Sequence, residues 1–222
     1  MRCLTQIFAS LLLLSLLGCT QRFQDTSDTV KEGLFGFDDV VMTKQQVDQL
    51  PYASMYVRVN DGPRVFMVLG FADTDPTTGR QQLKWLSADK AMIVTENGRI
   101  VKTLRLLNEN LAGISSADPW PDFQQTAPFQ WQLSYDWQPN YRFGYAAQIT
   151  TEPVGEETLT SLLWQQPTTI WREQIQFSSL DQQMQNQFWV TRSGQVVKSI
   201  QWLSPQGTRI ETELLKPYDD LE

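Results

Sequence analysis

A β-hairpin pattern occurs twice in this chain, and it limits the possible folds more than any other feature. Residues 90–107 (KAMIVTENGRIVKTLRLL) align with residues 186–203 (NQFWVTRSGQVVKSIQWL). Each copy is a β-branched run, a two-residue turn and a second β-branched run, which is the pattern of two paired strands. The identical pairs are Val94/Val190, Thr95/Thr191, Gly98/Gly194, Val101/Val197, Lys102/Lys198 and Leu107/Leu203. The sequence therefore predicts one hairpin in each half of the chain.

The turns of the two copies favour hairpins to different degrees. Asn97-Gly98 is the strongest short hairpin signal, because a type I′ turn needs positive φ at both central residues. Ser193-Gly194 is a weaker version of the same turn. The aligned lysines Lys102 and Lys198 are expected at equivalent solvent-facing or edge positions rather than in a binding pair.

Further strands are indicated by apolar side chains that alternate with polar ones. Residues 129–137 alternate strictly, and the alternation resumes over residues 141–145 after the turn at Pro139-Asn140. Residues 171–177 and 208–215 show the same period. Residues 56–69 predict a hairpin around a central Asp-Gly-Pro turn.

Two short helices are also predicted. Thr43 can cap a helix over residues 44–50, which Pro51 ends. Residues 155–166 place three leucines on one side and predict a second helix. The predicted fold class is therefore all-β, with mainly antiparallel sheets in a barrel- or sandwich-like arrangement. It includes an internal hairpin duplication and one or two short helices.

Composition excludes several classes of function. The chain has no histidine, which removes Ser-His-Asp and Cys-His nucleophiles, histidine zinc sites and imidazole catalysis. Its two cysteines, Cys3 and Cys19, both lie near the N-terminus, so the rest of the chain offers no disulfide or thiolate metal cluster. A net charge of −7 without a basic run argues against nucleic acid as a partner. We therefore expect no enzyme, metal site or cofactor.

The N-terminus has the features of a lipoprotein signal peptide. Residues 7–17 form an apolar run that is too short to span about 30 Å of hydrocarbon as a helix. The run ends in Leu16-Leu17-Gly18-Cys19, which resembles the lipobox of bacterial lipoproteins, although Leu17 stands where a small residue is usual. The resemblance implies cleavage after Gly18, with lipid such as palmitate attached to Cys19. An ordinary signal with an incidental cysteine is the alternative.

The predicted organisation has three parts. Residues 1–18 are the signal peptide, and residues 19–33 are the lipidated cysteine and a flexible tether without apolar periodicity. Residues 34–222 form a single β-rich domain with two pseudo-repeated halves, at about 52–111 and 141–217.

Aromatic residues between positions 118 and 145 are the candidate contacts for a glycan or a protein partner. Trp120, Trp137, Tyr141 and Tyr145 could stack on the apolar faces of sugar rings. The alternative is that the alternating aromatics only fill the core, which is favoured for the middle of the 129–137 row. Trp120 lies on a proline-rich loop, where exposure and burial are equally expected.

Three carboxylates lie among these aromatics: Asp118, Asp122 and Asp136. Paired carboxylates are the remaining route to acid–base catalysis, and glycoside hydrolysis uses such pairs. However, no nucleophile, base and orienting group can be named together. A carboxylate-based sugar hydrolase is therefore the least supported of the functional alternatives.

Several stretches in and around the hairpins share one resemblance. They are residues 51–54 (PYAS), 98–103 (GRIVKT), 106–107 (LL), 110–111 (NL), 141–145 (YRFGY), 188–190 (FWV), 194–199 (GQVVKS), 201–202 (QW) and 214–217 (LLKP). These residues resemble the group 4 capsule polysaccharide lipoproteins of the YjbF type. The similarity extends from about residue 41 to residue 217 and includes the lipobox.

The resemblance implies a non-catalytic accessory in capsule or exopolysaccharide production or export. It implies an outer-membrane lipoprotein facing the periplasm, and Thr20 after Cys19 agrees with sorting to that membrane. The implied partners are the membrane, through the lipid on Cys19, and envelope proteins of polysaccharide export. The polysaccharide itself is a further candidate partner. The alternative function is a periplasmic glycan-binding module that uses the 118–145 aromatics.

Overall fold

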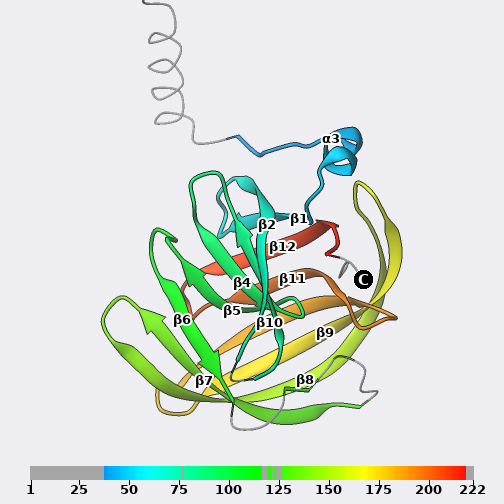
Figure 1. The fold of residues 1–222 in the computed structure, drawn as a ribbon. Helices are drawn as coiled ribbons and strands as arrows, with labels where there is room; N and C mark the ends of the chain where they lie inside the picture. Colours follow the sequence, from blue (N-terminus) through cyan, green and yellow to red (C-terminus); the bar gives the residue numbers. More distant parts are fainter. Residues whose placement is uncertain (1–37, 77, 117–119, 122, 124–126, 219–222) are drawn as a thin grey trace, which may run out of the picture. The chain divides into compact units, whose positions relative to one another are not determined.

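The computed structural model describes residues 38–76, 78–116, 120–121, 123 and 127–218 (Figure 1). Residues 39–222 form one compact unit, and its described part holds one helix and twelve strands. These elements are α3 (Lys44–Gln49), β1 (Ser54–Val59), β2 (Arg64–Thr74), β3 (Gln81–Leu86), β4 (Met92–Glu96), β5 (Arg99–Leu104), β6 (Asn110–Ser115), β7 (Phe129–Gln138), β8 (Arg142–Thr160), β9 (Gln165–Phe177), β10 (Gln182–Thr191), β11 (Val196–Trp202) and β12 (Arg209–Lys216).

The strands form one antiparallel sheet that curls into a nearly closed, barrel-like shape (Figure 1). The strand order is β5-β4-β3-β2-β1-β12-β11-β10-β9-β8-β7-β6. Neighbours in the sheet are also neighbours in the chain, except where β1 pairs with β12. The predicted all-β, antiparallel, barrel-like class with a short helix is confirmed. The division into two pseudo-repeated halves stays a prediction.

The sheet closes where its two end strands, β5 and β6, lie against each other. Side chains connect the described residues of these strands. The Thr103 hydroxyl accepts a hydrogen bond from the Leu111 N–H (2.9 Å), and the Asn110 amide oxygen accepts one from the Leu106 N–H (3.1 Å). Backbone donors at a strand edge need such partners when they are buried. The seam is therefore stabilised by side chains.

Both predicted hairpins form, but their turns differ. Asn97 and Gly98, between β4 and β5, have φ values of 44° and 74°, as a type I′ turn requires. Between β10 and β11, Gly194 has a φ of 87°, whereas Ser193 is not in the left-handed region. The Thr191 N–H donates to the Gln195 carbonyl (2.9 Å), so the second loop is one residue longer. Asparagine tolerates the left-handed backbone that the shorter turn needs better than serine does, because its side chain can hydrogen-bond locally.

The apolar rows predicted over residues 129–137 and 171–177 are largely buried, whereas Tyr141 and Phe143 of the row predicted over residues 141–145 are exposed. In β7, Leu133, Tyr135 and Trp137 are at most 4% exposed, and in β9 Ile175 and Phe177 are fully buried. These side chains belong to one core cluster that also includes residues of β1, β2, β3, β4, β5 and β12. Burial of such large apolar area is the main source of stability for a domain of this kind.

Helix α3 begins where predicted, after the cap residue Thr43. The Thr43 hydroxyl accepts a hydrogen bond from the Gln46 N–H (3.2 Å), and the Gln46 side chain accepts one from the Thr43 N–H (2.8 Å). Val47 is fully buried and packs with Tyr56 of β1 and Leu215 of β12. This small cluster is separate from the main core, so α3 covers the other face of β1 and β12.

The helix predicted over residues 155–166 is wrong. Residues 155–160 continue β8 and pair with β9, for example Thr160 with Gln165. The β-branched Thr158 and Thr160 favour a strand, and pairing supplies the backbone hydrogen bonds that a helix would have made. Leu162 and Leu163 lie in the connecting turn and pack against the α3 cluster, which explains the apolar pattern.

Candidate functional site

The two repeated hairpins meet inside the fold. Gly98, at the tip of the first hairpin, lies against Val196 of the second, so closely that an added Cβ would be 2.3 Å from the Val196 Cβ. The Gln201 amide of β11 donates to the Gly98 carbonyl (2.9 Å) and accepts from the Ile100 N–H (2.9 Å). One glutamine thus bonds a backbone carbonyl and a buried backbone N–H on either side of Arg99, at the start of β5. We call this contact the hairpin junction.

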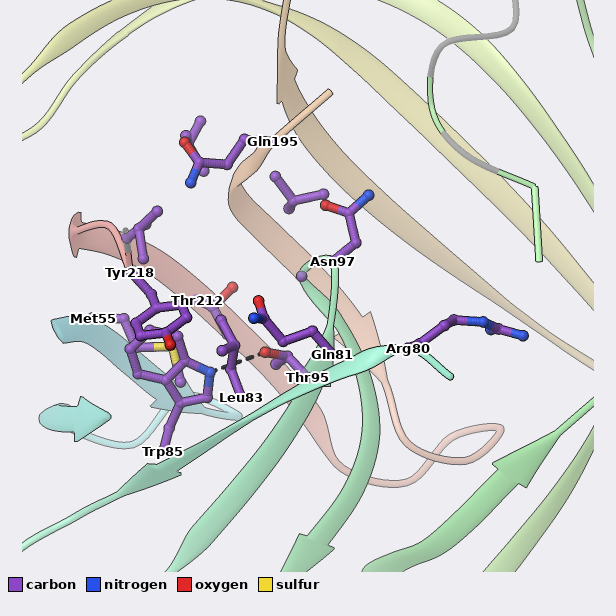
Figure 2. Close-up of a pocket in the computed structure, with 14 residues that line it drawn as sticks. Met55, Arg80, Gln81, Leu83, Trp85, Thr95, Asn97, Gln195, Thr212 and Tyr218 are labelled. Atoms are coloured by element: carbon purple, nitrogen blue, oxygen red, sulfur yellow. Dashed lines mark hydrogen bonds between the residues drawn. The ribbon is translucent and has the colours of Figure 1, made fainter. Parts of the chain in front are cut away.

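A pocket of about 360 Å³ lies beside the hairpin junction (Figure 2). Both hairpins line it, through Asn97-Gly98 and through residues 195–197, together with residues of β1, β3, β4 and β12. Its volume lies within the roughly 300–1,000 Å³ that is typical of small-molecule sites. The pocket is therefore the candidate functional site.

The inner part of the pocket is apolar and fixed. Trp85 is 2% exposed and Met55 is 3% exposed. The Trp85 indole N–H donates a hydrogen bond to the Thr95 hydroxyl (2.9 Å), which holds the ring in one orientation (Figure 2). Tyr218, which follows β12, lines the same pocket and packs against the core. Gln81, Asn97 and Gln195 form the polar rim of the pocket.

A buried ion pair fixes the first hairpin to β9. The Arg99 guanidinium contacts the Glu173 carboxylate, and their side chains are 6% and 1% exposed. The Thr151 hydroxyl also donates to Glu173 (3.3 Å). Burial, followed by the charge of Glu173, raises the pKa of Tyr135. The pair satisfies two charges that would otherwise be costly inside the barrel.

Aromatic rings surround the Arg99 guanidinium. Its central carbon lies 4.8 Å from the Trp131 ring centre and 5.2 Å from the Trp120 ring centre. Phe123 and Phe188 complete the shell at 5.1 and 5.3 Å. A cation over ring faces is stabilised by the ring quadrupole, more so when both are desolvated.

Trp120 belongs to this buried cluster and also contacts Arg80. It is half-buried, and the guanidinium of Arg80, a pocket-lining residue, lies 4.4 Å from its ring centre. Arg80 also pairs with Glu96 (3.4 Å), which in turn accepts a hydrogen bond from Gln82 (2.8 Å). Trp120 therefore lies between two arginines.

The other aromatic candidates lie apart from Trp120. Trp137 is 1% exposed and donates its indole N–H to the Leu203 carbonyl (2.6 Å), and the half-buried Tyr145 packs on its ring at 5.1 Å. Tyr141 is 91% exposed, with the Phe143 ring 6.5 Å away. The structure thus brings Trp137 and Tyr145 together but forms no single row of the four. Their role as glycan or partner contacts stays a prediction.

Of the other site residues predicted from the sequence, only Asp136 lies within the described residues. Asp136 of β7 accepts a hydrogen bond from the Gly144 N–H of β8 (2.7 Å). Asp118, Asp122 and Cys19 lie outside the described residues. Within the described ranges, no group of three or more acidic or cysteine side chains is placed to hold a metal ion. No helix in those ranges is long and apolar enough to cross a membrane.

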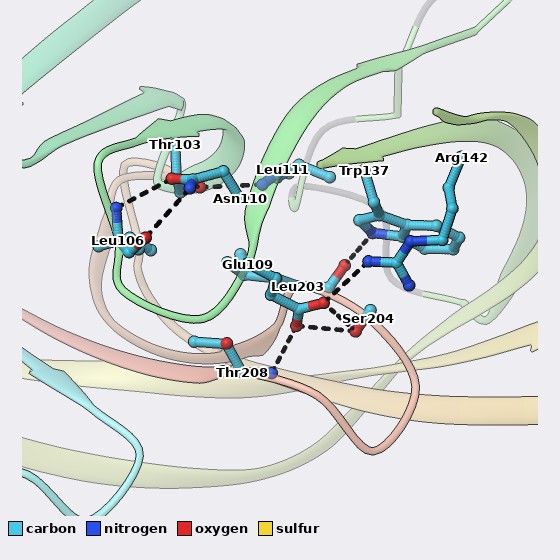
Figure 3. A network of polar contacts seen from close by, with 10 residues as sticks. All are labelled: Thr103, Leu106, Glu109, Asn110, Leu111, Trp137, Arg142, Leu203, Ser204 and Thr208. Atoms are coloured by element: carbon cyan, nitrogen blue, oxygen red, sulfur yellow. Dashed lines mark hydrogen bonds and ion pairs between the residues drawn. The ribbon is translucent and has the colours of Figure 1, made fainter. Parts of the chain in front are cut away.

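Glu109 organises a polar network at the seam of the barrel (Figure 3). Its carboxylate accepts hydrogen bonds from the Ser204 hydroxyl (2.8 Å) and the Thr208 N–H (2.6 Å), and it pairs with Arg142 (3.3 Å). Burial by itself raises the pKa of Glu109, but these three contacts outweigh it and leave the pKa below its usual value. The network joins the β5–β6, β7–β8 and β11–β12 connections.

Replacing Glu109 by glutamine is expected to lower stability at pH 7 by about 1–2 kcal/mol, since hydrogen bonds to a charged group are lost. The folded-state pKa is lowered, so this contribution is present above the unfolded pKa of about 4.3 and is lost as the pH falls through the folded pKa. Urea unfolding of both proteins at pH 7 and in acid measures this, with the exposed-site change Glu156→Gln as control. An equal loss of stability in Glu109→Gln at pH 7 and in acid would contradict the lowered pKa of Glu109.

Sequence reasoning missed the residues that build the junction. Glu173 stands in the predicted inward row of residues 171–177, and a carboxylate there was the available signal of a buried ion pair. Asn97 and Gln195 lie at or beside the repeated turns, but nothing local showed that the two turns meet. The aligned lysines differ: Lys102 is exposed, whereas Lys198 is half-buried, with its ammonium 3.7 Å from Glu211.

The fold, the junction and the pocket define a class of protein: an all-β domain whose single sheet nearly closes on itself around two meeting hairpins. Residues 27–215 match the family described as group 4 capsule polysaccharide lipoprotein gfcB, YjbF. The match covers most of the chain, and the chain belongs to this family. It is accordingly a lipoprotein, and the family resemblance inferred from the sequence is confirmed.

Curated relatives and a solved structure agree with this placement. The chain is 35% identical over 216 residues to the uncharacterized lipoprotein GfcB of Escherichia coli (strain K12), covering 95% of this chain and 98% of the relative. It is 30% identical over 211 residues to the uncharacterized lipoprotein YjbF of the same organism, covering 93% and 95%. The crystal structure of the hypothetical lipoprotein YmcC from Escherichia coli (K12) superposes with a TM-score of 0.70 at 34% identity, covering 86% of this chain and 96% of that one.

Proposed function

We propose that this chain is an outer-membrane lipoprotein that faces the periplasm and supports capsule or exopolysaccharide production or export. It acts without catalysis, through contacts with other envelope proteins. The observation that carries the proposal is membership, over residues 27–215, of a capsule polysaccharide lipoprotein family. The relatives GfcB and YjbF are lipoproteins, which supports a membrane-anchored role.

Exposed apolar side chains at one end of the barrel support docking to a protein partner. Leu107, Tyr141 and Phe143 are 102%, 91% and 55% exposed. Leu107 lies on the β5–β6 connection, Tyr141 on the β7–β8 connection and Phe143 at the start of β8, and these segments are neighbours because β6 pairs with β7. Aromatic side chains are enriched at protein interfaces, and contiguous exposed apolar patches mark interaction sites.

The anchor of this proposal is the lipid on Cys19. Acyl chains contribute about 0.8 kcal/mol for each buried CH₂ group, so several chains hold a protein on a membrane stably. Residues 19–33 would then act as the tether that lets the β domain reach its partners. An anchored protein samples partners in the same membrane at high effective concentration.

Replacing Cys19 by serine is expected to release the protein from the membrane fraction, and surface polysaccharide should fall to the level of cells that lack the protein. Cell fractionation and quantification of polysaccharide on washed cells measure the two effects. Cys3→Ser, at the other cysteine, is the matched control and should leave both unchanged. Full surface polysaccharide with a non-lipidated protein would show that anchoring is not required.

A further inference from the structure

The pocket at the hairpin junction has a lining suited to a ligand rich in hydroxyl groups. Its inner wall is apolar, with Trp85 and Met55 buried at the base. Its rim carries the side-chain amides of Asn97, which is exposed, and of Gln195, which is half-buried (Figure 2). A sugar has the same two sides, because its ring C–H groups are apolar and its edge is lined by hydroxyls.

The side-chain amides of Asn97 and Gln195 are available to form hydrogen bonds with a ligand. Among the described residues, neither side-chain amide makes a hydrogen bond. Each amide offers two donors and one acceptor oxygen, and a sugar hydroxyl both donates and accepts. An acyl chain in the same pocket would cover these groups without replacing their hydrogen bonds to water, which is unfavourable.

The described part of the lining contains one charged side chain, and that charge is paired with a carboxylate outside the lining. None of the described lining residues is acidic, and the one charged residue among them is Arg80. The Arg80 side chain points away from the other labelled lining residues (Figure 2). Its guanidinium lies 4.4 Å from the Trp120 ring centre and pairs with Glu96 at 3.4 Å. An uncharged ligand therefore fits the pocket better than a cation or a strongly anionic group.

We infer that this pocket binds a short, uncharged segment of a glycan. Asn97 and Gln195 bond its hydroxyls, and its apolar ring face lies toward the Trp85 end. The inference rests on the proposed function, which supplies a polysaccharide as the polymer near this protein. It differs from binding by the 118–145 aromatics, because none of those residues lines the pocket. The two copies of the hairpin thus act together, each supplying one amide.

The test is calorimetric titration of the full-length lipoprotein in phosphatidylcholine nanodiscs. The probe is a set of oligosaccharides made by partial hydrolysis of the surface polysaccharide of the cells that produce the protein. We expect saturable binding that weakens at least tenfold in Asn97→Gly/Gln195→Ala. Glycine keeps the positive φ of position 97, so the turn is preserved. Gln195→Ala alone, which removes no hydrogen bond of the described fold, should weaken binding in the same direction.

The matched control is Asn140→Gly/Gln185→Ala. Asn140 has a φ of 78° in a turn outside the pocket, and Gln185 is exposed on β10. This variant should bind as the wild type does, and thermal unfolding should show all variants folded. A flat titration of the wild type, or equal affinity in the two double variants, overturns the inference.

The outcome separates this inference from the proposed function. If the oligosaccharides fail to bind but cells without the protein lose surface polysaccharide, the pocket inference falls and the accessory role stands. If the oligosaccharides bind through Asn97 and Gln195 but such cells keep their surface polysaccharide, the accessory role falls and the glycan site stands.

Discussion

Replacing Glu173 by leucine is expected to destabilise the domain by about 3–5 kcal/mol, which is the typical cost of breaking a buried ion pair from one side. The Arg99 side chain is 6% exposed and would keep its charge among Trp120, Trp131 and Phe188 without a carboxylate beside it. The first hairpin would also lose its ionic contact with β9. Urea unfolding of the full-length protein at pH 7 measures the change.

The double variant Arg99→Met/Glu173→Leu is the control for this prediction. It removes both charges and keeps apolar volume, so most of the lost stability should return. If the double variant were as unstable as Glu173→Leu, the loss would come from packing rather than from an unpaired charge. A change below about 1 kcal/mol in the single variant would contradict burial of the pair.

Replacing Gly98 by alanine is expected to cost about 2–4 kcal/mol, because two separate penalties add. The φ of 74° is unfavourable for a residue with a Cβ. The new Cβ would also lie 2.3 Å from the Val196 Cβ, so the two hairpins would have to separate. Unfolding in urea gives the total cost.

Gly144 allows the two penalties to be measured separately. Its φ is 72°, and an added Cβ would meet nothing within 4 Å, so Gly144→Ala reports the backbone cost alone. The excess in Gly98→Ala is then the cost of steric overlap, and Val196→Ala in the same chain should recover part of it. Equal costs at positions 98 and 144 would show that the hairpin tips are not in close contact.

Local sequence patterns predicted the local structure well. The Asn97-Gly98 turn, the Thr43 cap and the alternation in β7 depend on residues close together in the chain, and the structure confirms them. The helix expected over residues 155–166 was wrong because its apolar pattern depends on contacts with residues distant in the chain. Two of its three leucines, Leu162 and Leu163, pack against a distant partner, the α3 cluster, and Leu159 belongs to strand β8.

The candidate site could not be derived from the sequence because it depends on contacts between distant residues. Gln201 reaches the backbone of Gly98 and Ile100, and Arg99 reaches Glu173. Alignment showed that the hairpins are alike, but only the strand order and the curl of the sheet bring them together. The single local hint was a carboxylate within an inward-facing row of β9.

The hairpin junction links the stability predictions to the proposed site. Gly98 and Val196 form both the close contact and part of the pocket wall, and Gln195 and Asn97 stand at its rim. Changes that separate the hairpins should therefore reshape the pocket as well as lower stability. A site built on paired strands is positioned more precisely than one on a free loop.

The most direct test of the accessory role is the amount of polysaccharide on cells that lack this protein. We expect a clear loss of surface polysaccharide, restored by the wild-type gene supplied in the same cells. An unchanged amount and chain length of surface polysaccharide in the absence of the protein would contradict a role in its production or export.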